Sequence, residues 1–263
     1  MSALLSVFRI RRKAEFQYRG AMLGGVVCQL VFGLILVAIY RALYETRPQE
    51  LPLQQVVSYV WIQQAFFRML LSSDSELNEK IAAGSIAYDL CRPINLYAYY
   101  YTRDMAIRMV GSLMRAVPLL TIAVLLPEGW GLSEPASFPA LICALISLLL
   151  GLFCVCALSA IGHAFTLITL DGRGIEAMLN LLLTTFSGNL LPLTLFPESW
   201  QLVIRVLPYA QLLDVPARIY TGSQPLSGVP LLWLMQLLWI VILILFGLLL
   251  WKKNEKRLVL QGG

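Results

Sequence analysis

The sequence has few charged residues: only 13% of its 263 positions are Asp, Glu, Lys or Arg. Soluble domains carry about 25%. Hydrophobic residues make up 59% of the chain, and the mean hydropathy is +0.74. A soluble chain of this length cannot bury so much apolar surface, because much of its area must face water. The composition therefore excludes a soluble domain, a disordered chain and a collagen-like fibre, and it indicates a protein that resides in lipid.

The chain also lacks the residues that most catalytic sites require. It has one histidine, His163, and no acidic cluster inside an apolar run, so we expect no metal site. No glycine precedes a lysine, which excludes the Gly-Lys-Ser/Thr of a P-loop. Ser187-Gly188 with His163 is the nearest approach to an intramembrane serine protease, but Thr185 stands where that motif has glycine. We therefore expect a protein that is not an enzyme and holds no cofactor of its own.

Cysteines are few as well, and their placement excludes a disulfide-stapled secreted scaffold. The five are Cys28, Cys91, Cys143, Cys154 and Cys156. Four lie in apolar runs, and Cys91 lies in a segment that we expect on the cytoplasmic side. On a helix, Cys154 and Cys156 would point about 200° apart, which suits neither a shared metal ion nor a disulfide. We interpret the cysteines as small buried hydrophobic residues.

The sequence is rich in long apolar runs. A helix needs about 20 apolar residues to cross the bilayer core. The second run is the most polar because it holds four glutamines, and the third reaches this length only by extending back through Arg115. No internal repeat or long linker divides the chain, so we expect a single all-α membrane domain over residues 1–263. Its six expected transmembrane helices are residues 21–40, 51–67, 105–127, 135–170, 177–197 and 222–251.

Lysine and arginine are unevenly distributed between the two expected sides of the membrane. Basic residues are concentrated before the first run and after the last one. Loops expected outside hold only Arg41, Arg47, Arg205 and Arg218. Because basic residues are retained on the cytoplasmic side, both termini are expected in the cytoplasm, with the chain in the plasma membrane, the inner membrane if it is bacterial. The net charge of +5 reflects this topology, and no nucleic-acid partner is needed to explain it.

Two segments outside the runs are expected to form helices. Residues 1–19 place Val7 and Ile10 on one face and basic residues on another, which is typical of an interfacial helix beside anionic headgroups. A basic tail that only fixes the topology is the alternative. Residues 74–84 follow a capping box, Ser73-Asp74-Ser75-Glu76, and end at a glycine. This short cytoplasmic helix is either a solvated connector or a surface that contacts a soluble partner.

The region after the fifth run, residues 187–222, combines prolines with apolar residues. Its four prolines, at positions 192, 197, 208 and 216, prevent one continuous helix. Residues 202–213 are nevertheless too apolar for a free loop. Broken, re-entrant half-helices on the outer side, buried against protein, satisfy both observations.

The entry to the third span mixes tyrosines with arginines. The tyrosines of residues 97–101 predict an aromatic belt at the membrane interface. Arg103 and Arg108 are expected to extend toward that interface. Arg115 lies deeper, and an arginine is costly in lipid. It is therefore a candidate for contact with an anionic substrate or with a carboxylate of another chain.

Polar residues recur with helical spacing on two spans. One stripe consists of Asn180, Thr184 and Ser187, and the other of Gln55, Tyr59 and Gln63. Such stripes either join helices through hydrogen bonds or line a path for a substrate. Both interpretations stay open, and all six residues are candidates for a substrate path.

Several short motifs follow one another in a characteristic order. Residues 80–93 read KIAAGSIAYDLCRP, with an isoleucine, a glycine-centred turn and a closing Leu-x-Arg-Pro. Ser-Gly, Pro and Phe-Pro follow over residues 187–197, then Leu-Pro, Pro, Ile-Tyr and Gly over 207–222, and the chain ends in Gln-Gly-Gly. Over nearly its whole length this arrangement resembles the membrane subunits of the ABC-2 type exporter family, particularly a branch with six spans.

The resemblance implies a permease that pairs with a second permease chain, identical or different, and docks cytoplasmic ABC ATPase subunits, which bind ATP and magnesium. It implies that residues 1–19 are an elbow helix, residues 74–84 a coupling helix and residues 187–222 outer re-entrant helices. In such contacts apolar anchors fill a groove and charges fix the register. The expected ATPase contact is formed by Glu76, Leu77, Glu79, Lys80 and Ile81.

The uncharged stripes favour a hydrophobic or amphipathic substrate, and drugs, lipids, peptides and glycans all remain open. An ion-coupled carrier would show inverted repeats and ionisable residues at the membrane midplane, and neither is evident in the sequence. A membrane scaffold without transport activity and an intramembrane enzyme are the alternatives from other classes.

Overall fold

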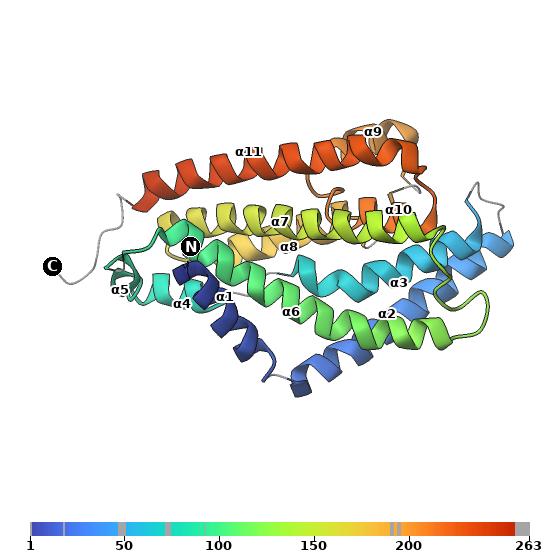
Figure 1. Ribbon diagram of the computed structural model, residues 1–263, viewed down its shortest axis with the longest axis horizontal. Helices are drawn as coiled ribbons and strands as arrows, with labels where there is room; N and C mark the ends of the chain where they lie inside the picture. The colour runs from blue at the N-terminus through green and yellow to red at the C-terminus, as the bar shows by residue number, and fades with distance from the viewer. Residues whose placement is uncertain are drawn as a thin grey trace.

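The computed structural model describes residues 2–17, 19–46, 51–71, 75–91, 93–189, 192–193 and 196–255. Within these ranges the chain is helical and contains no β-strand (Figure 1). The expected capping residues Ser73 and Asp74 and the terminal Gln-Gly-Gly lie outside them. The helices are α1 (Ser2–Glu15), α2 (Arg19–Thr46), α3 (Leu53–Leu70), α4 (Ser75–Ala82), α5 (Ala87–Leu90), α6 (Leu96–Leu125), α7 (Phe138–Thr169), α8 (Arg173–Phe186), α9 (Glu198–Val206), α10 (Asp214–Thr221), the 3-10 turn η2 (Leu226–Gly228) and α11 (Val229–Glu255).

Four segments of the described chain are long and apolar enough to cross a membrane: Gly20–Thr46, Leu96–Leu125, Phe138–Thr169 and Leu226–Glu255. They correspond to the first, third, fourth and sixth expected spans. Helices α6, α7 and α11 run along the length of the molecule, and α2 crosses it obliquely (Figure 1). These four candidate spans support the prediction of a multi-pass helical membrane protein. They do not test the expected number of six spans.

The second and fifth expected spans form helices that are not candidate spans: α3 is long enough but not apolar enough, and α8 is too short. Helix α3 has 18 residues and lies between α2, α6 and α7 (Figure 1). Helix α8 has 14 residues and ends at Phe186, well before the expected Pro197. It ends there because Gly188 takes a left-handed conformation, with φ of 81°, which a helix cannot continue through.

Helix α6 begins nine residues before the start that the apolar run suggested. Asn95 caps it, because its side chain accepts a hydrogen bond from the Ala98 amide at 2.9 Å. Arg103 and Arg108 interrupt the apolar run but not the helix. Both are buried against protein, so their charges do not limit where the helix begins.

Trp61 joins α3 to two neighbouring elements in the core. It is fully buried, and its ring packs where Gly33 of α2 leaves no side chain. Its indole nitrogen donates a hydrogen bond of 2.7 Å to the carbonyl of Trp130, in the connection between α6 and α7. Burying a large apolar side chain contributes about 1.5–3 kcal/mol, so this residue holds α2, α3 and that connection together.

The two ends of the bundle carry different short helices (Figure 1). Helices α4 and α5 lie at one end, where α1 begins and α11 ends. Helices α9 and α10 lie toward the opposite end. The prolines of residues 187–222 therefore do break the chain into short helices. Among them α10 is buried between α3 and α7, while α9 exposes Trp200, Leu202 and Val203.

Candidate functional site

Helix α4 packs its apolar face against the chain itself. Leu77 is fully buried and Ile81 nearly so. Both belong to one core cluster with Tyr100 of α6, Leu167 of α7 and Trp251 of α11. The expectation that Leu77 and Ile81 fill a groove on a partner is corrected, because their side chains are already enclosed. Their position instead fixes α4 beneath three of the long helices.

Glu76 on α4 is the centre of an ion network. Its carboxylate accepts hydrogen bonds from Arg11 of α1 at 3.0 Å and from Arg103 of α6, and Lys80 lies 3.4 Å away on the next turn. Burial alone would raise the pKa of Glu76, but the hydrogen bond and charge of Arg103, with the charges of Arg11 and Lys80, lower this pKa to about 2. Glu76 is therefore ionised at neutral pH and ties α1, α4 and α6 together.

Lys80 extends this network to α5. Its ammonium donates to the Asp89 carboxylate at 3.0 Å, and the Tyr100 hydroxyl donates to the same carboxylate at 2.7 Å. Burial opposes the charge of Lys80, but Asp89 and Glu76 raise its pKa overall. Gly84 adopts a φ of 69° in the turn between α4 and α5, which brings Asp89 back onto α4. The turn and both short helices are therefore held in one arrangement.

A further contact joins α4 to α8. The Asn78 amide donates a hydrogen bond of 2.5 Å to the Glu176 carboxylate in the first turn of α8. Gly172, just before α8, is required here because a Cβ at that position would overlap the Asn78 side chain. Helix α4 is thus connected to the helix that bears one of the two polar stripes.

The outward surface of this end is formed by other residues. Glu79 is exposed on α4, Ala83 directly after it, and Cys91 after α5. Tyr88 is 78% exposed, which is unusual for a tyrosine outside a binding surface. Of the five residues expected at a partner contact, the structure places Glu79 at this surface, Glu76 and Lys80 in the ion network, and Leu77 and Ile81 in the core.

The polar stripes of α3 and α8 meet where α8 ends. The Gln63 amide donates to the Ser187 carbonyl at 3.2 Å, and the Asn189 amide donates to the Gln63 carbonyl at 3.2 Å. A Cβ on Gly188 would overlap the Tyr59 hydroxyl. The Gln63 Oε1 and Ser187 Oγ atoms are buried without a partner among the described residues. Tyr59, Gln63 and Ser187 are therefore gathered at one place.

The remaining stripe residues lie apart from this meeting point. Gln55 accepts a hydrogen bond from Ser223 at 3.1 Å. Thr184 donates to the Asn180 carbonyl of its own helix at 2.7 Å. Asn180 and Thr184 are both partly exposed on α8. Whether any of the six stripe residues touches a substrate stays a prediction.

A buried ion pair within α10 also accepts a hydrogen bond from α3, which joins the two helices. The Arg218 guanidinium donates to Asp214 at 2.8 Å, one turn away on α10. The Tyr59 hydroxyl of α3 donates to the same carboxylate, also at 2.8 Å. Asp214 is fully buried. A buried charge is tolerated only when it is paired and hydrogen-bonded, and here both partners are present.

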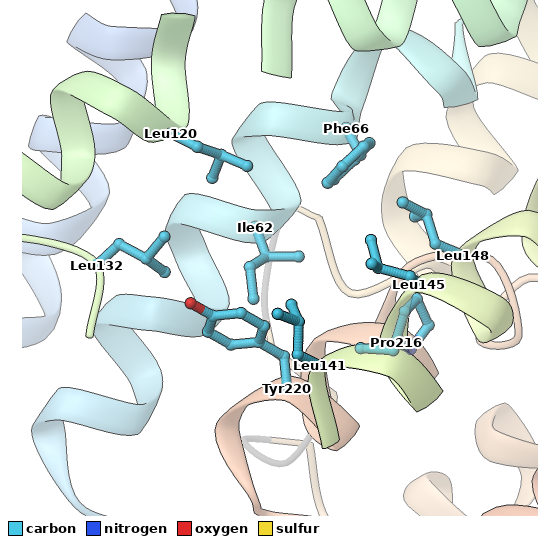
Figure 2. A pocket seen from close by; sticks show the side chains of 10 residues that line it. Ile62, Phe66, Leu120, Leu132, Leu141, Leu145, Leu148, Pro216 and Tyr220 are labelled. Carbon is cyan, nitrogen blue, oxygen red and sulfur yellow. The ribbon is translucent and has the colours of Figure 1, made fainter. Parts of the chain in front are cut away.

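An apolar cavity of about 220 Å³ lies beside this contact. Figure 2 shows Ile62 and Phe66 of α3, Leu120 of α6, Leu145 of α7 and Tyr220 of α10 directed into it. A second cavity of about 220 Å³ shares Phe66, Leu145 and Leu148 with the first and continues between α6 and α7, where Arg108 and Ser112 interrupt its apolar lining. Together they form an apolar groove, which suits a hydrocarbon group.

Two arginines and two of the four tyrosines at the start of α6 are buried in protein, which corrects two expectations. Arg103 binds Glu76, so it does not extend to the interface. Arg108 is fully buried; it pairs with Asp104 at 2.8 Å and donates to carbonyls at the end of α3, including that of Met69 at 2.6 Å. Two of the expected belt tyrosines are buried in the core cluster that contains Leu77 and Trp251.

The sequence analysis did not identify Asp89, Asp104 and Asp214. Each of these buried carboxylates binds a lysine or an arginine, and Asp89 and Asp214 also accept a hydrogen bond from a tyrosine hydroxyl. For two of them a signal was present, since Asp104 and Asp214 precede an arginine by four residues on a helix, the spacing of an intrahelical ion pair. No comparable spacing in the sequence indicates the partners of Asp89, which are Lys80 and Tyr100. In the described part of the chain, no three His, Cys, Asp or Glu side chains gather as metal ligands.

A family model described as "ABC-2 family transporter protein" matches residues 26–262. The chain belongs to this family, so the resemblance inferred from the motifs of residues 80–93 and 187–222 is confirmed. Permeases of the family are membrane subunits of transporters and generally work with ABC ATPase partners. No curated protein matches the chain.

Proposed function

We propose that the chain is the permease subunit of an ATP-driven exporter in the plasma membrane. In this proposal α3 and α8 complete six crossings, both termini are cytoplasmic, and α4 and α5 face the cytoplasm. Two permease chains form the working unit, and ATP and magnesium bind to separate ATPase subunits. Membership of the ABC-2 family and the basic residues at both ends of the chain support this topology.

The observation that carries the proposal is the set of contacts that α4 makes. It is joined to α1 and α6 through Glu76, to α8 through Asn78 and to the α6–α7–α11 core through Leu77. A short helix outside the bundle, held by so many long helices, cannot move without moving them. This is what a helix needs in order to transmit a partner's motion to the membrane.

The proposed ATPase contact is the outward surface of α4 and α5. Tyr88 is its aromatic anchor, because exposed tyrosines are typical of binding hot spots. Glu79 supplies a charge at the rim that steers the partner and fixes its register. Glu76 and Lys80 hold this surface in place from within, and Leu77 and Ile81 support it from the core.

The proposed substrate path follows the polar contact of α3 with α8 and the neighbouring apolar groove. Gln63 and Ser187 offer buried polar atoms without a partner in the described residues. The groove of Figure 2 offers apolar side chains, among them Ile62, the residue before Gln63 on α3. A polar contact beside an apolar groove favours a hydrophobic or amphipathic substrate.

The ATPase contact is tested by co-expressing the chain with the ABC ATPases of the same genome and purifying through the permease. Wild type should retain an ATPase, and Glu79→Lys combined with Tyr88→Ala should lose it. Glu134→Lys is the matched control, since Glu134 is exposed between α6 and α7, away from α4. Retention by the double variant would overturn the contact, and ATP-independent export by the purified chain would overturn the function.

A further inference from the structure

Arg115 on α6 has no ion pair or hydrogen bond with any described residue, and its Nε atom is buried. Its guanidinium lies against α2 at Gly25, where a Cβ would overlap the Cζ atom. Cys28, one turn further along α2, is close enough to interact with its charge. The residue is partly exposed. An unpaired guanidinium among apolar helices is costly, so an anion that reaches it is held strongly.

A second arginine lies on the same side of α6. Arg68, near the end of α3, packs its Cγ 3.4 Å from the place where Gly111 would carry a Cβ. Gly111 and Arg115 are one turn apart on α6 and so share a face. The Arg68 guanidinium donates one long hydrogen bond, of 3.4 Å, to the Leu71 carbonyl. Arg68 and Arg115 therefore lie along the same face of α6, one turn apart.

The nearby acidic residues do not neutralise the positive charge of Arg68 and Arg115. Asp104 and Glu15 both act on Arg68 through their charge. Asp104 is already bound to Arg108 at 2.8 Å. Glu15, the last residue of α1, forms no ion pair with either Arg68 or Arg115 in the described chain. The two arginines therefore present more positive charge than the surrounding side chains neutralise.

The surroundings of Arg115 are apolar and face outward. On α2, the helix that Arg115 touches, Phe32, Ile35 and Ile39 are exposed on the side of the helix nearest Gly25, and α2 is a candidate membrane span. Gly25 lies six residues after the start of α2, which corresponds to about 9 Å along the helix. A ligand that reaches the arginines along α2 must therefore have apolar chains next to its anionic group.

We infer that Arg68 and Arg115 form a binding site for the phosphate of an anionic phospholipid. The guanidinium groups hold the phosphate oxygens, since arginine suits phosphate geometry. Gly25 keeps α2 close enough for Arg115 to reach across it. The acyl chains lie along the exposed face of α2. The site is separate from the proposed ATPase contact and from the apolar groove.

A second copy of this chain is a weaker candidate for the anion. In the long helices α2, α6, α7 and α11 of the described chain the acids are Glu45, Asp104 and Glu255; Asp104 already binds Arg108, and the other two lie at helix ends. The phosphate of a lipid has no arginine partner that would compete with Arg68 and Arg115. It also reaches α2 from the bilayer, which is the direction in which α2 is exposed.

The site is tested on the purified full chain by native mass spectrometry during titration with phosphatidylglycerol. Phosphatidylcholine with the same acyl chains and soluble glycerol 3-phosphate are titrated in parallel. Wild type should bind phosphatidylglycerol most tightly. Arg115→Gln and Arg68→Gln should each weaken that binding on the order of tenfold, the effect of losing one charged hydrogen bond. Gly25→Ala keeps both arginines but displaces the guanidinium, and it should weaken binding too.

Arg173→Gln is the matched control, because Arg173 is an exposed arginine outside the spans, and it should bind as wild type does. Equal phosphatidylglycerol affinity in wild type, Arg115→Gln and Arg68→Gln would overturn the site. Glycerol 3-phosphate that binds as tightly as phosphatidylglycerol would overturn the lipid as its ligand. Dissociation of a dimer by Arg115→Gln with unchanged lipid binding would instead assign Arg115 to a chain–chain contact.

Discussion

Arg11 on α1 donates a hydrogen bond of 3.0 Å to the Glu76 carboxylate on α4, across 65 positions of sequence. Arg103 of α6 binds the same carboxylate. One acid therefore joins the first helix of the chain, a short helix at the end of the bundle and a long membrane helix. The geometry of α4 depends on this ionised group.

Glu76→Gln should remove a stabilisation that depends on pH. The folded-state pKa of Glu76 is lowered from 4.5 to about 2, so the stabilisation is complete above pH 4.5 and is lost as the pH falls toward 2. The difference in melting temperature between wild type and Glu76→Gln, measured in detergent, should be constant from pH 7 to pH 5 and shrink below that. Glu79→Gln, at an exposed position of the same helix, is the control. A difference that grows on acidification would contradict this role of Glu76.

Leu77→Ala should destabilise the fold. Leu77 is fully buried against α6, α7 and α11, and removing a buried leucine side chain costs about 2–5 kcal/mol. Unfolding of the purified protein by sodium dodecyl sulfate measures this loss. Leu231→Ala, at an exposed position of α11, should cost far less. Equal stability of Leu77→Ala and wild type would mean that α4 does not pack as described.

Arg108→Met should cost about 3–5 kcal/mol, because it leaves the buried Asp104 carboxylate without its partner. The double variant Arg108→Met with Asp104→Leu removes both charges and should recover part of that loss. The same unfolding assay, arranged as a double-mutant cycle, measures the coupling between the two residues. Additive effects of the two substitutions would argue against the pair.

Tyr59→Phe should cost about 1.5–3 kcal/mol, the range for a hydrogen bond to a charged group. The lost bond is the one to Asp214, which holds α10 against α3. Tyr209→Phe is the control, because the Tyr209 hydroxyl has no hydrogen bond with the described residues. An equal effect of both variants would show that the Asp214 contact contributes nothing specific.

The sequence predicted α4 and the broken helices of residues 187–222, because their signals are local, but it did not predict α5. Helix α4, Ser75–Ala82, falls within the expected residues 74–84 and is followed by the expected glycine turn. The prolines of residues 187–222 also predicted interrupted helices, which α9 and α10 are. Caps, glycines and prolines act within a few residues, so a single sequence reveals them.

These local signals could not predict which element packs against each face of a helix. The spacing of Leu77 and Ile81 shows that α4 has an apolar face, and we expected a partner there. The chain's own core occupies it. Arg103 was expected to reach the interface, but its partner, Glu76, lies 27 residues earlier on another helix. Periodicity identifies an apolar or charged face but not the element that packs against it.

The central claim is that an ATPase docks on the cytoplasmic surface of α4 and α5, and Cys91 reports on it directly because its thiol is exposed beside α5. The most direct measurement is the labelling of Cys91 by a membrane-impermeant maleimide, with Cys91→Ser to identify the signal. We predict no labelling in intact cells, rapid labelling in inside-out vesicles, and protection when the ATPase is bound. Labelling of Cys91 in intact cells, or the same rate with and without bound ATPase, would contradict the account.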